Sequence, residues 1–368
     1  MIPVSEPVIG AAELRNAQDA LQAGWVSSTG RYVDEFETGF ARYCGRRHGI
    51  AVSSGTAALQ LAVSCLGVES GDEIIMPSFT IISCALAVIY NDATPVLVDV
   101  EADTWCLDPA QVEERITSRT RAIMPVHMYG HPAEMEAIMA LAAKRGLAVI
   151  EDAAEAHGAE YQGRKCGSFG DASCFSFYAN KIVTTGEGGM VLTDDDGLAA
   201  HARSKRNLCF DARRRFVHED LGFNFRLTNV QAALGVGQLE RIESVVARKR
   251  QVARMYSAGL ADLPLQLPVE REGAKSVYWM YGVVLSDEAG FGADMFAAGL
   301  AERGVQTRPF FVGMHEQPAL RSRGLFEGES YPVTQRLSER GLYLPSGQAI
   351  TDDQIGEVIA AVRSVLGR

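Results

Sequence analysis

The stretch Cys174-Phe-Ser-Phe-Tyr-Ala-Asn-Lys-Ile-Val-Thr-Thr-Gly-Glu-Gly-Gly189 joins an apolar run to a glycine-rich turn around a single lysine, Lys181. The aromatic run that ends at Tyr178 predicts a strand, and the glycines let the backbone bend sharply after it. A lysine between an apolar strand and such a turn is partly desolvated, which lowers the pKa of its amine. The neutral amine can form a Schiff base with an aldehyde cofactor. On this stretch alone, a lysine that caps the strand and extends its amine into water fits equally well.

Composition places the chain among ordinary globular proteins. It has 368 residues, 47% hydrophobic and 22% charged, a length suited to one large domain and a smaller one. The net charge of -11 argues against a nucleic-acid-binding surface. No run approaches the roughly 18 apolar residues of a membrane span, and the first residues lack the regions of a signal peptide. We therefore expect a cytoplasmic protein without nucleic acid or membrane as partner.

Cysteine and histidine spacing points away from disulfides and metal. No two of the seven cysteines form a Cys-x-x-Cys motif, so they are predicted to be small core residues in a reducing compartment. His127 and His131 are four residues apart, but Gly130 and Pro132 break any helix that would align them. With no obvious third ligand, we expect no metal site.

Strands alternate with helices from residue 50 onward. The patterns predict strands at 50–52, 74–76, 95–100, 122–126, 147–150 and 191–193. They predict helices at 57–66, 81–90 and 198–206, and one that starts at Pro132 and ends at Gly146. Two helices, 11–23 and 33–43, precede them around a loop at 24–30. This alternation predicts an α/β fold with a large, mostly parallel sheet and helices on both faces.

The C-terminal third follows a different pattern. One long helical pattern from 229 to 260 suggests a connector between two domains. Beyond it, we predict a strand at 277–285, a helix at 294–303, an extended segment at 306–311 and a closing helix at 353–366. The expected organisation is a large α/β domain, 1–245, and a smaller α+β domain, 246–368.

Three features besides Lys181 suggest one anionic, planar ligand. Ser54-Gly55-Thr56 lies at a strand-to-helix turn, where backbone amides suit a phosphate, although its hydroxyls also fit a simple N-cap. Asp152 follows a predicted strand, where a carboxylate can keep a pyridine nitrogen protonated; a helix N-cap is the alternative. Glu155 can share a face with Asp152, and Ser176 can add a hydroxyl to the phosphate.

Competing motifs are missing from the sequence. Gly186-Glu187-Gly188-Gly189 lacks both the Gly-Lys-Ser/Thr of a nucleotide P-loop and the Gly-x-Gly-x-x-Gly of a dinucleotide fold. No Gly-x-Ser-x-Gly nucleophile elbow appears.

These residues, in this order and over nearly the whole chain, resemble the DegT/DnrJ/EryC1/StrS family of sugar aminotransferases. The resemblance implies the fold type I, aspartate aminotransferase-like architecture, pyridoxal 5'-phosphate as cofactor, and a homodimer with active sites at the subunit interface. The matching segments are 54–59, 71–77, 151–158, 175–177 with 180–181, and 184–189.

The resemblance assigns roles to individual positions. Lys181 resembles the lysine that binds the cofactor aldehyde, Asp152 the partner of the pyridine nitrogen, and Glu155 the residue near the phenolic oxygen. Phosphate contacts are implied for Gly55, Thr56, Ser176 and, lent by the partner subunit, Asn229. The family usually carries an aromatic residue after Pro-x-x-Thr that stacks on the cofactor ring. Here Ile81 follows Pro77-Ser78-Phe79-Thr80, so either an aliphatic group packs on the ring or the contact comes from elsewhere.

The resemblance also implies the reaction, in which an amino group moves from L-glutamate to the 4-keto carbon of a nucleotide-linked 4-keto-6-deoxy sugar. A keto sugar on another nucleotide (UDP or dTDP, at C3 or C4) or a cyclitol ketone remains the main alternative. Dehydratases of this fold replace the lysine with histidine, so Lys181 argues against that activity, and a non-enzymatic regulator is a further alternative. Arg308 can bind an acidic group of either substrate or form a surface ion pair. The complete set of candidate substrate contacts is Trp25, Ser28, Arg308 and His315.

Overall fold

The computed structural model describes residues 1–211, 213–214 and 216–367. Within these residues, seven strands form a main sheet, four form a second sheet and three form a small third sheet. The main sheet has the order β1-β9-β8-β5-β4-β2-β3. Its strands are β1 (His48–Val52), β2 (Glu73–Pro77), β3 (Thr94–Val98), β4 (Thr120–Ile123), β5 (Ala148–Asp152), β8 (Ala172–Ser176) and β9 (Gly189–Thr193).

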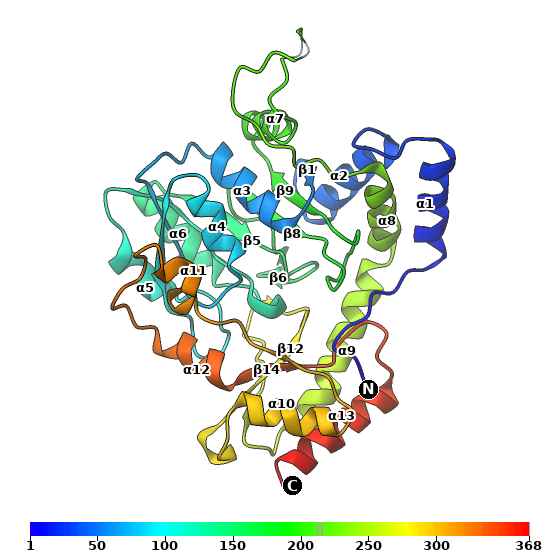
Figure 1. Cartoon of the computed structure of the whole chain (residues 1–368), viewed down its shortest axis with the longest axis vertical. Coiled ribbons are helices and arrows are strands. Elements are labelled where there is room, and N and C mark those ends of the chain that lie inside the picture. Colours follow the sequence, from blue (N-terminus) through cyan, green and yellow to red (C-terminus); the bar gives the residue numbers. More distant parts are fainter. Residues whose placement is uncertain (212, 215, 368) are drawn as a thin grey trace.

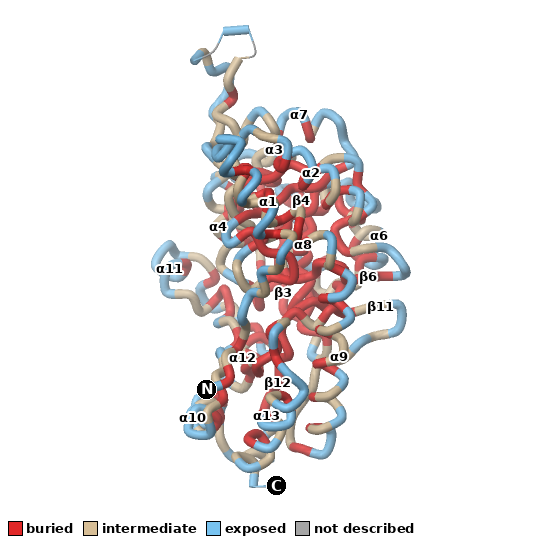
Figure 2. The backbone as a smooth tube through the Cα atoms, turned by 90° about the vertical axis from the view of Figure 1, so that its right-hand side faces the viewer, coloured by how far each residue is buried: buried red, intermediate tan, exposed pale blue. Residues whose placement is uncertain are grey.

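The expectation of a large, mostly parallel sheet is confirmed. All neighbouring pairs from β8 to β3 are parallel, whereas β9 runs antiparallel to both β8 and β1. Helices α3 (Gly55–Cys65) and α4 (Ser83–Ile89) lie in front of the sheet and α6 (Met135–Arg145) behind it (Figure 1). Because helices cover both faces, β2 and β9 are buried along their whole length, and buried residues fill the middle of the molecule (Figure 2).

The remaining helices complete the layers around the main sheet and the C-terminal part. Helices α1 and α2 both contact α8, and α2 also packs on the edge strand β1. The bounds are α1 (Ala11–Gln22), α2 (Arg31–Tyr43), α5 (Pro109–Arg115), α7 (Asp196–Lys205), α8 (Asn229–Glu240), α9 (Ile242–Leu260), α10 (Ala293–Glu302), α11 (Pro318–Arg321), α12 (Pro332–Arg340) and α13 (Asp352–Val365). Short 3-10 turns cover η1 (Met128–Gly130), η2 (Asp287–Ala289) and η3 (Met314–Glu316).

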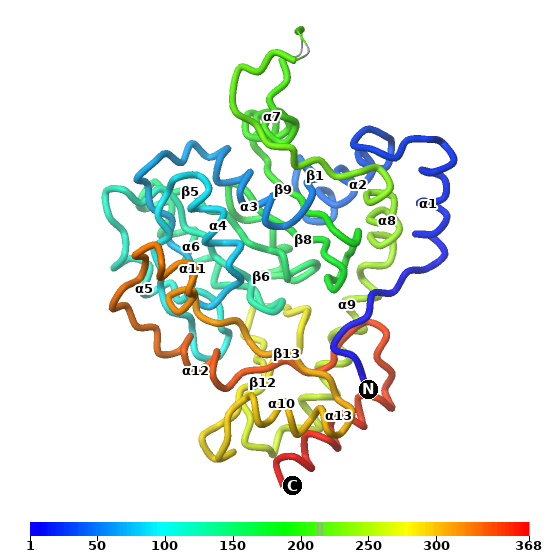
Figure 3. The backbone as a smooth tube through the Cα atoms, in the orientation of Figure 1, coloured from blue at the N-terminus to red at the C-terminus, as the bar shows by residue number. Residues whose placement is uncertain are grey.

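A second sheet forms the lower part of the molecule. Its order is β10-β12-β14-β13, and α9, α10 and α13 lie around it (Figure 1). The N-terminus returns to this part, where Ile2 pairs with Val305, so both ends of the chain lie there (Figure 3). The strands are β10 (Leu265–Gln266), β12 (Tyr281–Leu285), β13 (Arg308–Pro309) and β14 (Gly341–Leu344); the third sheet contains β6 (Glu160–Tyr161), β7 (Arg164–Lys165) and β11 (Ala274–Lys275).

Two local predictions were wrong. The pattern from 229 to 260 forms two helices, because the chain leaves helical geometry at Arg241 (φ -114°, ψ 9°). There the Nε of Arg241 donates to Glu13 at 3.0 Å, which ties the break to α1. Pro132 does not start a helix: α6 begins at Met135, since the preceding segment is held in a loop by a hydrogen bond from the Ala133 amide to the ring of His127.

A buried polar network holds the strand that leads into the candidate site. The Glu151 carboxylate on β5 accepts backbone N–H bonds from Gly167, Phe169 and Gly170 at 2.7–2.8 Å. The Arg46 guanidinium lies 3.7 Å away. Burial alone would raise the pKa of Glu151, but the hydrogen bond from His127 and these contacts lower it to about 2. Glu151 is therefore a structural anion that anchors β5, and its neighbour Asp152 faces the other way.

Candidate active site

One cavity of about 360 Å³ brings together the ends of both sheets. Its walls come from the ends of β5 and β8, the first turns of α3 and α4, and aromatic residues of the C-terminal part. Such a position, beyond the carboxyl ends of parallel strands, is where α/β sheets bind ligands. The predicted residues Gly55, Thr56, Asp152, Glu155, Ser176 and Lys181 all line this cavity.

Lys181 lies in the loop after β8, with its side chain 9% exposed. Its Nζ is 3.7 Å from the Oε1 of Glu155 and 3.5 Å from the centre of the Trp279 ring. The indole is held in place because its N–H donates to the Asn180 carbonyl at 2.9 Å. Burial lowers the pKa of Lys181, against the opposing effect of Glu155 and Asp152. The amine is thus enclosed rather than extended into water, and this burial favours the neutral form that acts as a nucleophile or base.

Glu155 is the second ionisable group of the cavity wall. Its Oε2 accepts the backbone N–H of Tyr129 at 2.8 Å, and Tyr129 adopts a left-handed conformation (φ 50°) in the turn that presents this amide. Burial raises the pKa of Glu155 to about 7, although Lys181 and the Tyr129 amide act in the opposite direction. Burial shifts the pKa values of Lys181 and Glu155 toward the neutral forms of both groups, and their separation of 3.7 Å makes each the other's candidate partner for proton exchange.

Asp152 is the last residue of β5 and is 2% exposed. Its Oδ1 accepts the Ala154 N–H at 3.0 Å, and its Oδ2 accepts the Cys84 thiol at 3.1 Å. The residues that follow form turns rather than a helix, so the alternative of a helix N-cap is wrong. The carboxylate therefore faces the cavity with two donors already on it.

The first turn of α3 forms the opposite wall. Ser54 caps this helix, since its Oγ accepts the Ala57 N–H at 3.1 Å, and Thr56 shares a hydrogen bond of 2.8 Å with Ser83. A Cβ on Gly55 would lie 2.7 Å from the Cβ of Ser176, so glycine permits the close approach of α3 to β8. The free amides of this helix N-terminus and the hydroxyl of Ser176 suit a phosphate.

Aromatic groups enter the cavity from the C-terminal part. Trp279, Phe311 and Tyr343 line it together with Ile81, a residue that is 43% exposed. A planar ligand therefore has both an aliphatic group and rings within the same cavity.

Asn229 lies outside this cavity in its own chain. It is buried at the start of α8, where its Oδ1 accepts the Tyr32 N–H at 3.1 Å and its Nδ2 donates to the Trp25 carbonyl at 2.7 Å. Gly30 (φ 147°) passes so close that a Cβ there would lie 2.4 Å from the Asn229 side chain. Trp25 and Asn229 border a separate cavity of about 450 Å³.

The other candidate substrate contacts are dispersed. Ser28 lines a cavity of about 680 Å³ together with Arg203, Arg206 and Arg226. Arg308 is exposed on β13, opposite Tyr343 of β14, and so lies beside the aromatic wall. His315 is buried, and its Nδ1 lies 2.8 Å from the Ser78 hydroxyl, outside the cavity lining. One chain does not bring these residues together, and their roles stay predictions.

Sequence reasoning missed several neighbours of the predicted residues. Cys84 carries no motif of its own, the segment around Trp279 gives no sign of its contact with Lys181, and the Tyr129 contact is made by a backbone amide. Asn180 and Trp279, which share a hydrogen bond, are 99 residues apart. Local patterns contain no signal for such a contact.

Metal-binding clusters and membrane-spanning helices are both absent from the residues that the structure describes. In that part of the chain no three His, Cys, Asp or Glu side chains are grouped so that they could hold a metal ion. No helix there has the length and apolar character needed to cross a membrane.

Comparison with known proteins gives consistent matches along the chain. The model of the DegT/DnrJ/EryC1/StrS aminotransferase family matches residues 7–363. GDP-perosamine synthase of Caulobacter vibrioides is 42% identical over 367 residues, which cover 99% of this chain and 98% of that protein. The solved structure of S. venezuelae DesV with a ketimine intermediate is 39% identical with a TM-score of 0.91, covering 97% of this chain and 95% of that one. DesI, solved in the presence of its TDP-sugar product, is 35% identical with a TM-score of 0.90, covering 100% and 93%.

Proposed function

The chain belongs to the DegT/DnrJ/EryC1/StrS aminotransferase family, whose enzymes depend on pyridoxal 5'-phosphate, and we propose that it aminates the 4-keto carbon of GDP-4-keto-6-deoxymannose with L-glutamate as donor. The product would be GDP-perosamine. The observation that carries the proposal is the single cavity that joins an enclosed lysine, a buried carboxylate and a phosphate-type helix N-terminus.

The residues of the cavity fit this cofactor. Gly55 lets the start of α3 approach Ser176 closely, and the amides at this helix start together with the Ser176 hydroxyl would hold the phosphate. Asp152 would keep the ring nitrogen protonated, and Lys181 would hold the aldehyde carbon. When bound, the cofactor supplies an electron-accepting ring that stabilises the carbanion formed when a substrate carbon loses its proton.

Lys181 is proposed to move the protons of both half-reactions. In the first, its Nζ takes the proton from the α-carbon of glutamate; in the second, it gives a proton to the sugar carbon that receives the amino group. The second step needs the protonated amine, whereas the first needs the neutral amine, which must therefore be regenerated. Burial beneath Trp279 supports the neutral state, and Glu155, 3.7 Å away, is the nearest group to exchange the proton with.

The substrate is proposed from similarity to GDP-perosamine synthase along almost the whole chain. DesI, which is 35% identical, was solved with a TDP-sugar product, so an aminotransferase for another keto-sugar nucleotide is the second candidate. The test incubates the purified protein with glutamate and a panel of GDP-, UDP- and dTDP-linked 3-keto and 4-keto sugars, read by mass spectrometry. Amination of the GDP-linked 4-keto sugar at the highest kcat/KM supports the proposal. Preference for another nucleotide overturns it in favour of the second candidate.

Experiments on the same protein preparation distinguish an aminotransferase from a dehydratase or a non-enzymatic regulator. Lys181 stands where dehydratases of this fold carry histidine, and it is enclosed with Asp152 and Glu155 in one cavity. A protein that binds the cofactor, changes its absorbance on addition of glutamate and releases 2-oxoglutarate is an aminotransferase. No spectral change with glutamate would favour the regulator.

A homodimer with shared active sites is part of the proposal. Beside Asn229, the apolar residues Trp25 and Val26 are 57% and 49% exposed. This exposure supports an interface in which a second copy of the chain covers the loop. Mixing Lys181→Ala chains with Asn229→Ala chains tests it: if Asn229 acts in the partner's site, a mixed dimer has one intact site and activity returns to roughly a quarter of wild type. Full activity of Asn229→Ala alone would contradict the role.

We also propose a cytoplasmic location and a two-domain division at residues 245 and 246. All seven cysteines are free in the structure, which supports a reducing compartment. Helix α9 contributes Val245 and Val246 to the larger buried cluster and Val252 and Ala253 to the smaller one, which supports a boundary within it. Cell fractionation and limited proteolysis test the two statements.

A further inference from the structure

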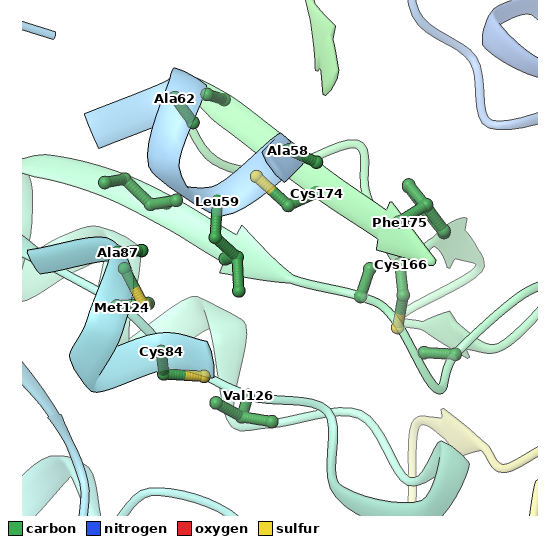
Figure 4. Close-up of a cluster of buried hydrophobic side chains, with 14 of the residues drawn as sticks. Ala58, Leu59, Ala62, Cys84, Ala87, Met124, Val126, Cys166, Cys174 and Phe175 are labelled. Atoms are coloured by element: carbon green, nitrogen blue, oxygen red, sulfur yellow. The ribbon is translucent and has the colours of Figure 1, made fainter. Parts of the chain in front are cut away.

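The thiol of Cys84 contacts the carboxylate of Asp152 directly. Its Sγ lies 3.1 Å from Oδ2, whereas Oδ1 is occupied by the Ala154 amide. Among the residues that the structure describes, Cys84 supplies the only side-chain hydrogen bond to this carboxylate. Cys84 has no exposed surface and lies in the first turn of α4, with its sulfur directed toward Val126, which pairs with Asp152 (Figure 4).

The chemistry of the neighbours sets the direction of this hydrogen bond. An ionised carboxylate only accepts, so the thiol hydrogen points to Asp152. The Thr80 hydroxyl, 3.3 Å from the sulfur, then donates to Cys84. Burial, followed by the charge of Asp152, raises the pKa of the Cys84 thiol well above its ordinary value, so it keeps its hydrogen. The resulting chain runs from Thr80 through Cys84 to Asp152.

We propose that Cys84 is a positioning residue that fixes the orientation of the Asp152 carboxylate toward the cofactor's ring nitrogen. This inference rests on the role proposed above for Asp152. A thiol is a weak donor, so it restrains the carboxylate while leaving most of its negative charge for the second partner. An alanine would leave Oδ2 free to rotate, and a serine would restore a donor at the same position.

The test measures the dissociation constant of pyridoxal 5'-phosphate for the full-length protein after removal of cofactor, by equilibrium dialysis. Loss of one weak donor to the carboxylate is expected to weaken binding about fivefold in Cys84→Ala, and Cys84→Ser is expected to bind within about twofold of wild type. Cys106→Ala is the matched control: Cys106 is equally buried and its thiol donates to the His131 carbonyl at 3.4 Å, away from the cavity. Cys106→Ala should bind the cofactor as wild type does.

A double-mutant cycle with Asp152→Asn separates positioning from packing. If Cys84 acts through Asp152, the fivefold effect of Cys84→Ala disappears in the Asp152→Asn background. An effect that persists there, or wild-type affinity of Cys84→Ala, overturns the inference while leaving the aminotransferase proposal intact. Wild-type affinity of Asp152→Asn alone would overturn the proposed role of Asp152 and the inference with it.

A second measurement does not depend on the alanine variant folding. The S–H stretching band of Cys84 can be assigned in the infrared spectrum as the band absent from Cys84→Ser. Asp152→Asn should shift this band toward that of a weaker hydrogen bond, because an amide oxygen is a poorer acceptor than a carboxylate. An unchanged band would mean that the thiol does not donate to Asp152.

Discussion

Replacing Glu155 with glutamine tests whether burial or ion pairing has the larger effect on the charge of Glu155 in the cavity. Glu155 and Lys181 lie 3.7 Å apart, with 8% and 9% of their side chains exposed. A close pair of this kind can be a stabilising ion pair, or it can be a buried pair that favours the neutral forms. Burial is the largest influence on both groups: it raises the pKa of Glu155 to about 7 and lowers the pKa of Lys181. These directions indicate a buried pair that favours the neutral forms.

The sign and size of the effect follow from linkage. The pKa of Glu155 rises from an ordinary 4.5 to about 7 on folding, so the folded state holds the proton more tightly than the unfolded chain. The contribution of Glu155 to stability is complete below pH 4.5 and is lost as the pH rises through 7. The full shift corresponds to about 3 kcal/mol at 1.36 kcal/mol per unit, of which about 2.5 kcal/mol falls between pH 5 and pH 8.

The assay compares urea unfolding of the cofactor-free wild type and Glu155→Gln at pH 5 and pH 8. Glutamine keeps the acceptor for the Tyr129 amide but does not ionise. From pH 5 to pH 8 the free energy of unfolding of the wild type should therefore fall by about 2.5 kcal/mol more than that of the variant. Glu187→Gln, at an exposed position of the same cavity, serves as control and should show no such difference from wild type. A relative loss of stability for Glu155→Gln at pH 8 would refute the reasoning, because it would mean that an ion pair dominates.

Three other variants probe the site and its support. Lys181→Ala should lower amino transfer from glutamate about 10²–10⁴-fold by mass spectrometry, and a rate within threefold of wild type would exclude its role as the proton carrier. Gly55→Ala should weaken cofactor binding about tenfold in equilibrium dialysis, because its Cβ would lie within 2.7 Å of another side chain; Gly356→Ala, with open space around it, should not. Arg46→Ala removes the guanidinium that lies 3.7 Å from the buried Glu151 carboxylate and donates to the Gly167 carbonyl, and should cost about 3–5 kcal/mol in urea unfolding, against less than about 1 kcal/mol for the exposed Arg47→Ala; equal costs would contradict a structural role.

Much of the fold was predictable because its elements are local. Helix α3 and strands β2 and β5 follow from apolar runs bounded by turn residues, and the large, mostly parallel sheet follows from their alternation. The errors arose where distant contacts override the local pattern. The helix predicted from 229 to 260 breaks at Arg241, which bonds to Glu13 far away in the chain. The antiparallel insertion of β9 and the two-residue strands carry no distinctive pattern either.

The sequence by itself determined the identity of the chemical groups and their local settings: a lysine before a glycine turn, carboxylates after a strand, and hydroxyls at a helix start. Only the tertiary structure decided what surrounds them. Trp279 covers Lys181 from the C-terminal part, and Cys84 reaches Asp152 from α4. The physical reason is that burial and hydrogen bonding depend on which surfaces pack together, and those surfaces come from residues far apart along the chain. The same reason applies to Asn229, because its predicted phosphate contact depends on packing against a second copy of the chain.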